Sequence, residues 1–220
     1  MCGRFSQFYT WQQLQALYAI HDQPASNLEP RYNISPTDRA GVVRVRRSGE
    51  RAYEEMRWGL VPFFWKKSLK EVPATFNARA EGIATAGMFR DAFKRHRCIV
   101  PASGFFEWTG PKTAREPWFI SAADGAPLSF AGLWDRWIDP ATKEEIRSFT
   151  IIVTDANAFV GKMHDRMPVV LDAAGREAWL ASADVSLLKP APEAALRAWR
   201  VTPKMNSNKY QEPDAATAIA

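Results

Sequence analysis

Apolar and polar residues alternate, or form short apolar runs, through most of the chain, and this pattern is typical of β-strands. Val42 to Arg47 alternates apolar and basic residues, and Ser48-Gly49 marks a turn before Arg51 to Leu60. The two segments predict a β-hairpin with Arg44 and Arg46 on its solvated face. Further strands are predicted at Cys98–Trp108, Trp118–Ser121, Leu128–Trp137, Ile146–Thr154 and Pro168–Leu171. The fourth of these runs is nearly all apolar, which favours a position deep in the sheet.

Helical periodicity is confined to short segments. Thr10 and Gln13 have the spacing of a capping box, which predicts a helix with one apolar face made of Trp11, Leu14, Leu17 and Tyr18. Further helices are predicted at Ala86–Arg95, at Ala156–Lys162, from the N-cap Asp172 to about Ser182, and at Pro192–Arg200. The proline-containing stretches Asp22–Pro36 and Pro62–Pro73 are expected to be loops, and the second is also aromatic and basic.

Strands outnumber helices, and most are joined by short turns. The 220 residues show no compositional break and no repeats, so we expect a single domain. These features predict an α+β fold in which one mixed, largely antiparallel, barrel-like sheet carries peripheral helices. The domain is expected to span residues 1–203, and residues 204–220 are expected to form a polar, mobile tail.

Composition narrows the possible functions only slightly. Twenty-nine Lys and Arg residues against 24 Asp and Glu residues give a net charge of +5, which permits an anionic partner without requiring one. Nine tryptophans fit two interpretations, a stacking groove for single-stranded nucleic acid and an aromatic-rich core. Both interpretations remain open from composition alone.

The two cysteines, Cys2 and Cys98, are too few for a disulfide framework, and no Cys-x-x-Cys or His-x-x-x-His spacing predicts a zinc site. No signal-peptide pattern is present, and no apolar run reaches the roughly 18 residues of a membrane-spanning helix. We therefore expect a cytoplasmic protein with reduced thiols, no metal and no membrane partner.

The N-terminal sequence Met1-Cys2-Gly3-Arg4 offers a distinctive chemical pair. Methionine aminopeptidases remove Met1 when the next residue is small, and Cys2 would then carry a free α-amine beside its thiol. Their reference pKa values, about 8 and about 8.5, leave useful fractions of neutral amine and thiolate near neutral pH. The amine can condense with an aldehyde to an imine, and the thiol can then close a thiazolidine. The alternative is that Cys2 is merely a small buried hydrophobic residue.

A carboxylate between two aromatic residues is the sharpest internal feature. Glu107 lies between Phe106 and Trp108, and strand alternation would place it on the opposite face from both. On a solvated face Glu107 would be unremarkable. In a cleft, partial desolvation would raise its pKa toward neutrality, as a general acid or base requires.

Two further segments combine polar residues suited to chemistry or anion binding. In Asn77-Ala78-Arg79, the Asn77 amide could orient a reacting amine while the Arg79 guanidinium binds a phosphate, although a solvated turn would also look like this. His164 lies at the junction of a predicted helix and strand, and its pKa near 6.5 suits proton transfer. Its alternative role is structural, paired to Asp165.

Taken together, these residues resemble the SOS-response-associated peptidase (SRAP) family, the abasic-site processing proteins. Six motifs occur in the expected order and cover the chain from Met1 to about Pro203: MCGR at the start, RYNISP at 31–36, WGLVP at 58–62, NARAE at 77–81, ASGFFEW at 102–108 and HDRMP at 164–168. Each motif alone is weak, and the ordered set carries the resemblance.

The resemblance implies loss of Met1 and an N-terminal nucleophile, Cys2, that captures the ring-opened aldehyde of an abasic site in single-stranded DNA. The expected product is a stable thiazolidine DNA–protein crosslink that shields the lesion, formed without a cofactor by a monomer that lies at the nucleoid when bound. The resemblance assigns Asn77, Glu107 and His164 as the other catalytic residues. It places Arg4, Arg79, Trp108 and Arg166 in the DNA groove and Trp65 near the groove.

The chemistry of these residue types agrees with that assignment. Asn77 would orient the α-amine of Cys2, His164 would help to open the deoxyribose ring, and Glu107 would shuttle protons during imine formation and closure. DNA affinity should come from phosphate contacts and stacking, so binding should weaken with salt and show little sequence preference. An imine on an abasic sugar also permits β-elimination, so strand-cleaving lyase activity would compete with closure.

Two alternatives belong to other functional classes. A sequence that starts Met-Cys-Gly also opens glutamine amidotransferase domains, whose freed cysteine attacks an amide. Such a hydrolase would need substrate-clamping motifs that we do not find, and Arg4-Phe5 stands where a small apolar run would be expected. The family name suggests peptidase activity. Self-removal of Met1 would be a peptidase reaction at the same site, so this alternative overlaps with aldehyde capture by Cys2. The non-enzymatic alternative is a single-stranded DNA-binding module in which Cys2 is incidental.

Overall fold

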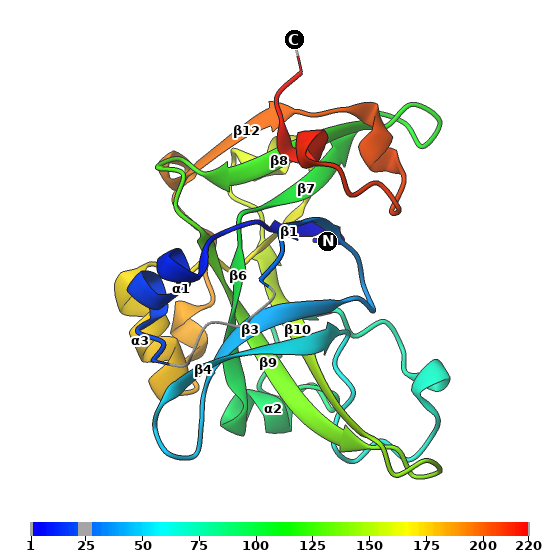
Figure 1. Ribbon diagram of the computed structural model, residues 1–220, viewed down its shortest axis with the longest axis vertical. Helices are drawn as coiled ribbons and strands as arrows, with labels where there is room; N and C mark the ends of the chain where they lie inside the picture. The colour runs from blue at the N-terminus through cyan, green and yellow to red at the C-terminus, as the bar shows by residue number, and fades with distance from the viewer. Residues whose placement is uncertain (1, 22–27, 220) are drawn as a thin grey trace.

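The computed structural model describes residues 2–21 and 28–219. Two β-sheets lie one above the other (Figure 1). The upper sheet has the order β12-β8-β7-β1-β2 and contains β1 (Phe5–Gln7), β2 (Arg31–Ile34), β7 (Gly104–Thr109), β8 (Glu116–Ala122) and β12 (Leu196–Arg200). The lower sheet contains β3 (Arg39–Val45), β4 (Arg51–Trp58), β5 (Asn77–Arg79), β6 (Arg97–Ala102), β9 (Leu128–Ile138), β10 (Glu145–Asp155) and β11 (Arg166–Pro168).

The lower sheet closes into a barrel. Its strands run in the order β10-β4-β3-β6-β9, and β9 pairs with β10 again, which completes a ring of five strands. Neighbours in the ring are antiparallel except β4 and β10, which are parallel. β5 also runs parallel to β10, with Asn77 opposite Ile151. The predicted mixed, largely antiparallel, barrel-like α+β fold is confirmed.

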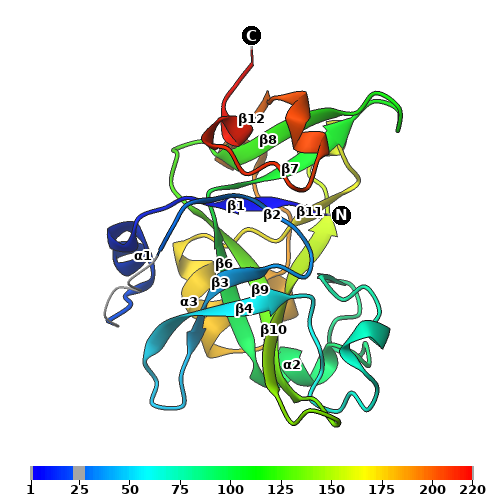
Figure 2. The ribbon, with the colours of Figure 1, turned by 45° about the vertical axis from the view of Figure 1, so that its right-hand side comes forward.

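Among the described residues, three α-helices lie on the outside of the barrel, and α1 and α3 share one side of it in both views (Figures 1 and 2). The helices are α1 (Trp11–Tyr18), α2 (Arg90–Arg95) and α3 (Ala173–Ala181). The predicted capping box is present at α1, where Thr10 Oγ1 accepts from the Gln13 amide and the Gln13 side chain accepts from Thr10 N–H. Asp172 caps α3 as predicted, since its carboxylate accepts from the Gly175 amide.

The main core is built from side chains of both the barrel strands and the upper sheet. It contains Phe5 of β1, Trp58 of β4 and Phe105 of β7, and the Phe5 and Trp58 rings meet edge to face at 4.9 Å. The opposite face of the upper sheet has a separate apolar cluster that includes Phe106 and Phe119. β7 therefore contributes alternate side chains to two cores, which fixes the orientation of the residues that follow.

The predicted strand Cys98–Trp108 is wrong as one element. It is two strands, β6 in the barrel and β7 in the upper sheet, and the chain changes sheet at Ser103. There the Ser103 amide donates to Ser6 O, and the Ser103 hydroxyl accepts from the Phe8 amide. Both strands are buried, so apolar residues continue across the change of sheet. The sequence pattern therefore does not indicate where one strand ends and the next begins.

Several predicted helix boundaries are corrected. The predicted helix Pro192–Arg200 is a 3₁₀ turn followed by strand β12, which pairs with the edge of β8. The predicted helix Ala86–Arg95 becomes helical only at Arg90, and Ala156–Lys162 contains only the 3₁₀ helix Val160–Lys162. Segments this short cannot form stable helices by themselves, so tertiary pairing decides their conformation.

The expectations for strand 168–171, the 22–36 loop and the hairpin also need correction. β11 ends at Pro168, and only Val170 of the expected continuation forms a bridge, to Phe130. Residues 22–27 of the predicted loop lie outside the described residues, and Arg31–Ile34 is an edge strand.

The β3–β4 hairpin is confirmed. The Arg44 side chain, however, is mostly buried, and it donates a hydrogen bond to Glu54 over 2.5 Å.

The segment after Pro203 is not a free tail, contrary to the sequence prediction. Two 3₁₀ helices, Pro203–Asn206 and Pro213–Ala216, lie across the upper sheet (Figures 1 and 2). Met205 and Ala215 are fully buried in the cluster with Phe106 and Phe119. The segment is mostly polar in composition, so the sequence pattern did not indicate that these two apolar residues attach it to the upper sheet. None of the helices within the described ranges is long and apolar enough to cross a membrane.

Candidate active site

The N-terminal residues are held where the two sheets meet. β1 pairs with β7, and Arg4 O accepts from the Phe106 amide at 3.0 Å. Cys2 is consequently buried in the main core. On the barrel side, Asn77 Nδ2 donates to Cys2 O at 2.8 Å. The amide of Asn77 therefore contacts Cys2, as expected, although its partner is the carbonyl oxygen. Asn77 Oδ1 is buried and accepts no hydrogen bond from any described residue.

Glu107 faces the core and not the solvent. It shares the β7 face of Phe105 and is only 4% exposed, so the interpretation of a solvated strand face is wrong. Burial, reinforced by the Asp165 carboxylate, raises the pKa of Glu107 to about 8. A carboxyl group in this range exchanges its proton near neutral pH, as the cleft interpretation requires.

The Cys2 thiol differs from the sequence expectation. Burial, together with the Glu107 carboxylate, raises the pKa of the thiol well above its usual range. Its sulfur lies 3.9 Å from Arg4 O, a weak hydrogen-bond contact. The resting thiol is therefore neutral, and a nearby base must take its proton before it can attack.

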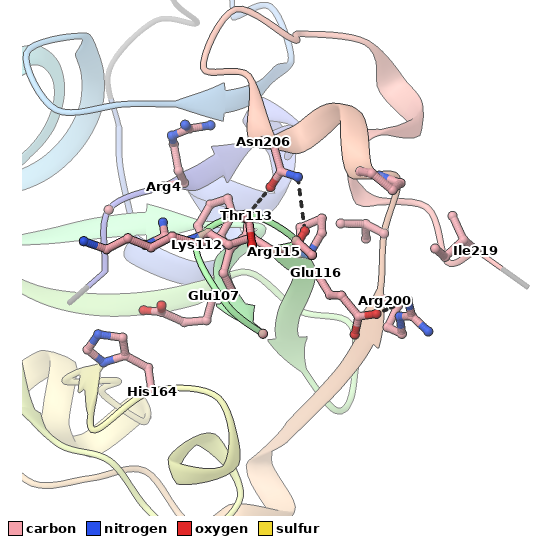
Figure 3. Close-up of a pocket in the computed structure, with 17 residues that line it drawn as sticks. Arg4, Glu107, Lys112, Thr113, Arg115, Glu116, His164, Arg200, Asn206 and Ile219 are labelled. Atoms are coloured by element: carbon pink, nitrogen blue, oxygen red, sulfur yellow. Dashed lines mark hydrogen bonds and ion pairs between the residues drawn. The ribbon is translucent and has the colours of Figure 1, made fainter.

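His164 reaches the same region from the segment before β11. Its Nδ1 accepts from the Arg166 amide at 2.9 Å and lies 2.8 Å from the Asp165 carboxylate. Burial lowers the pKa of His164, which favours the neutral ring. Because Nδ1 accepts from the Arg166 amide, proton transfer to or from a substrate would use Nε2. Figure 3 shows the His164 ring and the Glu107 carboxyl group facing one another.

An open pocket of about 1040 Å³ extends outward from this pair (Figure 3). Its inner wall contains Glu107, His164, Trp108 and Arg4. The rest of the wall comes from the N-terminal segment, the β7–β8 connection, the start of β8, the end of β12 and the C-terminal segment. It consists of Gly3, Gly110, Lys112, Thr113, Ala114, Arg115, Glu116, Pro117, Arg200, Val201, Pro203, Asn206 and Ile219. No pattern in the sequence predicted that the C-terminal segment would line this pocket.

The predicted DNA-binding residues separate into two groups. Arg4 and Trp108 lie together in the pocket, with the guanidinium carbon of Arg4 5.5 Å from the centroid of the Trp108 ring. Arg79 is exposed at the end of β5. The Arg166 side chain is mostly buried and forms ion pairs. Trp65 accepts at its carbonyl from Trp137 Nε1 and does not line the pocket.

The ion pairs of Arg166 join β11 to its neighbours. Arg166 Nη1 lies 2.7 Å from the Glu81 carboxylate and 3.3 Å from the Asp155 carboxylate. Its positive charge is thus already compensated in this structure. Within the described ranges, no group of three or more His, Cys, Asp or Glu side chains is arranged to hold a metal ion.

Comparison with known proteins adds evidence from sequence and fold. The model of the SOS response associated peptidase (SRAP) family matches residues 1–208. Abasic site processing protein YoqW of Bacillus subtilis is 32% identical over 224 residues, covering 97% of this chain and 98% of YoqW. Abasic site processing protein YMR114C of Saccharomyces cerevisiae is 36% identical, covering 82% of this chain and 51% of the yeast protein. A crystal structure from Bacteroides thetaiotaomicron is similar over both entire chains, with a TM-score of 0.87 and 28% identity.

Proposed function

The chain belongs to the SOS response associated peptidase (SRAP) family, and on this basis we propose that it processes abasic sites in single-stranded DNA by covalent capture. The names of its relatives support the processing of abasic sites. The capture step is our finer proposal: after removal of Met1, Cys2 forms a thiazolidine with the ring-opened aldehyde.

The arrangement of Asn77 and Glu107 around Cys2 is the observation that carries this proposal. Asn77 donates to the carbonyl oxygen of Cys2, and its buried Oδ1 is an acceptor suited to the α-amine. The Glu107 carboxylate is close enough to raise the pKa of the Cys2 thiol. An amine, a thiol and a carboxyl group that titrates near pH 8 thus belong to one site. This set can form both bonds of a thiazolidine.

Ring opening precedes capture, because the closed sugar of an abasic site has no free aldehyde. His164 lies at the pocket wall, and its Nδ1 is occupied by the Arg166 amide. The protonated form of His164 can donate its Nε2 proton to the ring oxygen of the sugar as the C–O bond breaks, and the lowered pKa of the ring favours this transfer. The proton of the anomeric hydroxyl passes to a water molecule, so the aldehyde is released and a neutral imidazole remains.

Glu107 can supply and recover one proton during capture. The neutral α-amine adds to the aldehyde carbon and forms a carbinolamine. Protonated Glu107 gives its proton to the departing hydroxyl, which leaves as water, and an iminium ion remains. The Glu107 carboxylate then takes the proton of the Cys2 thiol as sulfur bonds to the iminium carbon. The product has lost one water, and Glu107 is protonated again.

β-Elimination is the competing fate of the imine. If thiazolidine closure is the faster step, strand cleavage should be minor in the wild type. Cys2→Ala keeps an N-terminal amine but lacks the thiol, so it should form a reducible imine and cleave more strand. A Cys2→Ala variant that gives neither imine trapping nor cleavage would contradict this scheme.

Intact mass after incubation with an abasic single-stranded oligonucleotide, followed by denaturation, tests the proposal. We expect a species without Met1 whose mass is the sum of protein and DNA less one water. Cys98→Ala is the matched control, because Cys98 is the other buried cysteine and lies in the barrel strand β6. It should crosslink normally, whereas Cys2→Ser should give no durable adduct. A wild-type protein that lacks Met1 and forms no adduct would exclude covalent capture.

A further inference from the structure

Asn206 connects two walls of the pocket that lie far apart in the sequence. Its Oδ1 accepts from Trp108 Nε1 at 2.9 Å, and its Nδ2 donates to Arg115 O at 3.1 Å (Figure 3). Trp108 is at the end of β7, and Arg115 is in the connection to β8. One amide side chain therefore fixes both the indole and the β7–β8 connection.

The residues on either side of Asn206 fix a third part of the wall. Met205 O and Ser207 O lie 3.3 and 3.4 Å from Arg4 Nη1, which donates to them. Arg4 also donates to Asn33 Oδ1 at 2.9 Å. Because the Arg4 guanidinium lies over the Trp108 ring, residues 205–207 set the relative positions of both side chains.

Residues 205–207 are themselves held in place by packing and hydrogen bonds. Met205 is fully buried in the apolar cluster of the upper sheet. Asn33 Nδ2 donates to Ser207 O at 3.1 Å and to Tyr210 O at 2.8 Å, while the Gln211 side chain bonds both backbone groups of Asn33. Asn206 is thus presented to the pocket from a backbone with several independent attachments.

We propose that Asn206 is a positioning residue of the DNA-binding pocket, acting through Trp108. This inference rests on the proposed function. The partly exposed Trp108 ring is suited to stack on a nucleobase beside the lesion. A ring held by a hydrogen bond at Nε1 loses less conformational freedom when the base binds, so fixing the ring in advance raises affinity. The C-terminal segment therefore belongs to the substrate site as well as to the fold.

A merely structural role for Asn206 would change stability but would not act through the indole. Asn206→Ala removes both hydrogen bonds. Asn208→Ala is the matched control, because Asn208 is an exposed residue of the same segment and is not among the described residues that line the pocket. Trp108→Phe removes the indole donor while leaving an aromatic ring in place.

Two measurements on the full chain test the inference. The first is binding of a single-stranded oligonucleotide that carries tetrahydrofuran, an abasic analogue without an aldehyde. We expect Asn206→Ala to weaken binding about tenfold, from partial loss of one stacking contact. The control should bind like the wild type, and Asn206→Ala should have no further effect in the Trp108→Phe background. An undiminished effect in that background would overturn the inference.

The second measurement is the ¹⁵N spectrum of the tryptophan indoles without DNA. The Trp108 signal, identified by its absence in Trp108→Phe, should shift and exchange faster with water in Asn206→Ala and stay unchanged in Asn208→Ala. An unchanged Trp108 signal in Asn206→Ala would overturn the inference. A wild-type protein that neither binds nor crosslinks abasic DNA would instead refute the proposed function, and the indole signal would still decide whether Asn206 positions Trp108.

Discussion

Glu107 shows how the environment of one residue changes its chemistry. The same carboxyl group on a solvated strand would be ionised at neutral pH, with a pKa of about 4.3. Between the core of the barrel and Asp165 its pKa is raised to about 8, so the folded protein holds a proton that the unfolded chain has released. Folding and proton binding are therefore coupled at the site.

The coupling predicts how stability changes with pH. From about pH 5 to about pH 8, folded Glu107 binds more protons than unfolded Glu107, so its contribution to the free energy of unfolding falls as pH rises. The loss should approach about 1.4 kcal/mol per pH unit. Glu107→Gln has no titrating group and should lack this slope.

Urea unfolding of both proteins at intervals between pH 5 and 8 checks the prediction. The stability of the wild type relative to Glu107→Gln should decrease steadily over this range. A constant difference would mean that Glu107 titrates normally in the folded protein. The same pair of proteins tests the chemistry, because protonated Glu107 is needed for dehydration and the crosslinking rate of the wild type should fall above about pH 8.

At the scale of elements, β7 brings the site together. It pairs with β1, which places Cys2, and it carries Glu107 and Trp108 itself. Its first residue, Gly104, lies against β8: an added Cβ would come within 2.3 Å of the Phe119 ring and 2.6 Å of Ile120 O. Glycine is required there for close approach, because a larger residue would push the two strands apart.

Gly104→Ala should therefore destabilise the protein by about 1–3 kcal/mol, the usual cost of overpacking. It should also slow crosslinking, because a displaced β7 moves Glu107. Gly87→Ala is the control, since an added Cβ at Gly87 meets no atom within 4 Å. Urea unfolding measures the first effect, and equal midpoints for the two variants would contradict the packing argument.

At the scale of the whole molecule, the C-terminal segment covers one face of the upper sheet and forms part of the pocket wall. Residues 203–219 cover the apolar face that Phe106 and Phe119 would otherwise expose. Trp199 Nε1 donates to Ala216 O at 2.9 Å, and Ile219 N donates to Arg200 O at 3.0 Å, so the segment is also tied to β12. Its removal would affect both stability and the outer wall of the pocket.

A charge placed in the buried anchor of this segment tests its contribution. Ala215→Asp puts a carboxylate into the apolar cluster and should cost about 2–4 kcal/mol of unfolding free energy. Ala218→Asp makes the same change at an exposed position and should stay within about 0.5 kcal/mol of the wild type. Thermal or urea unfolding distinguishes them, and a mobile segment would make both variants equally harmless.

Much of the secondary structure and part of the site followed from the sequence. The capping box at Thr10, the Asp172 cap and the β3–β4 hairpin depend on residues close together in the chain, so local patterns predicted them. Residue type and motif singled out Asn77, Glu107 and His164, and the structure shows that Asn77 contacts Cys2 while Glu107 and His164 line one pocket. Their chemical roles remain predictions.

The sequence by itself therefore determined the local elements and the identity of the reactive groups. Tertiary structure decided the change of sheet at Ser103, the conversion of residues 196–200 into a strand, and the contribution of Asn206 to the pocket. It also decided that Glu107 is protonated near neutral pH and that the Cys2 thiol is neutral. These properties depend on which residues, distant in the sequence, cover a group and exclude water from it. Those residues come together only when the whole protein folds.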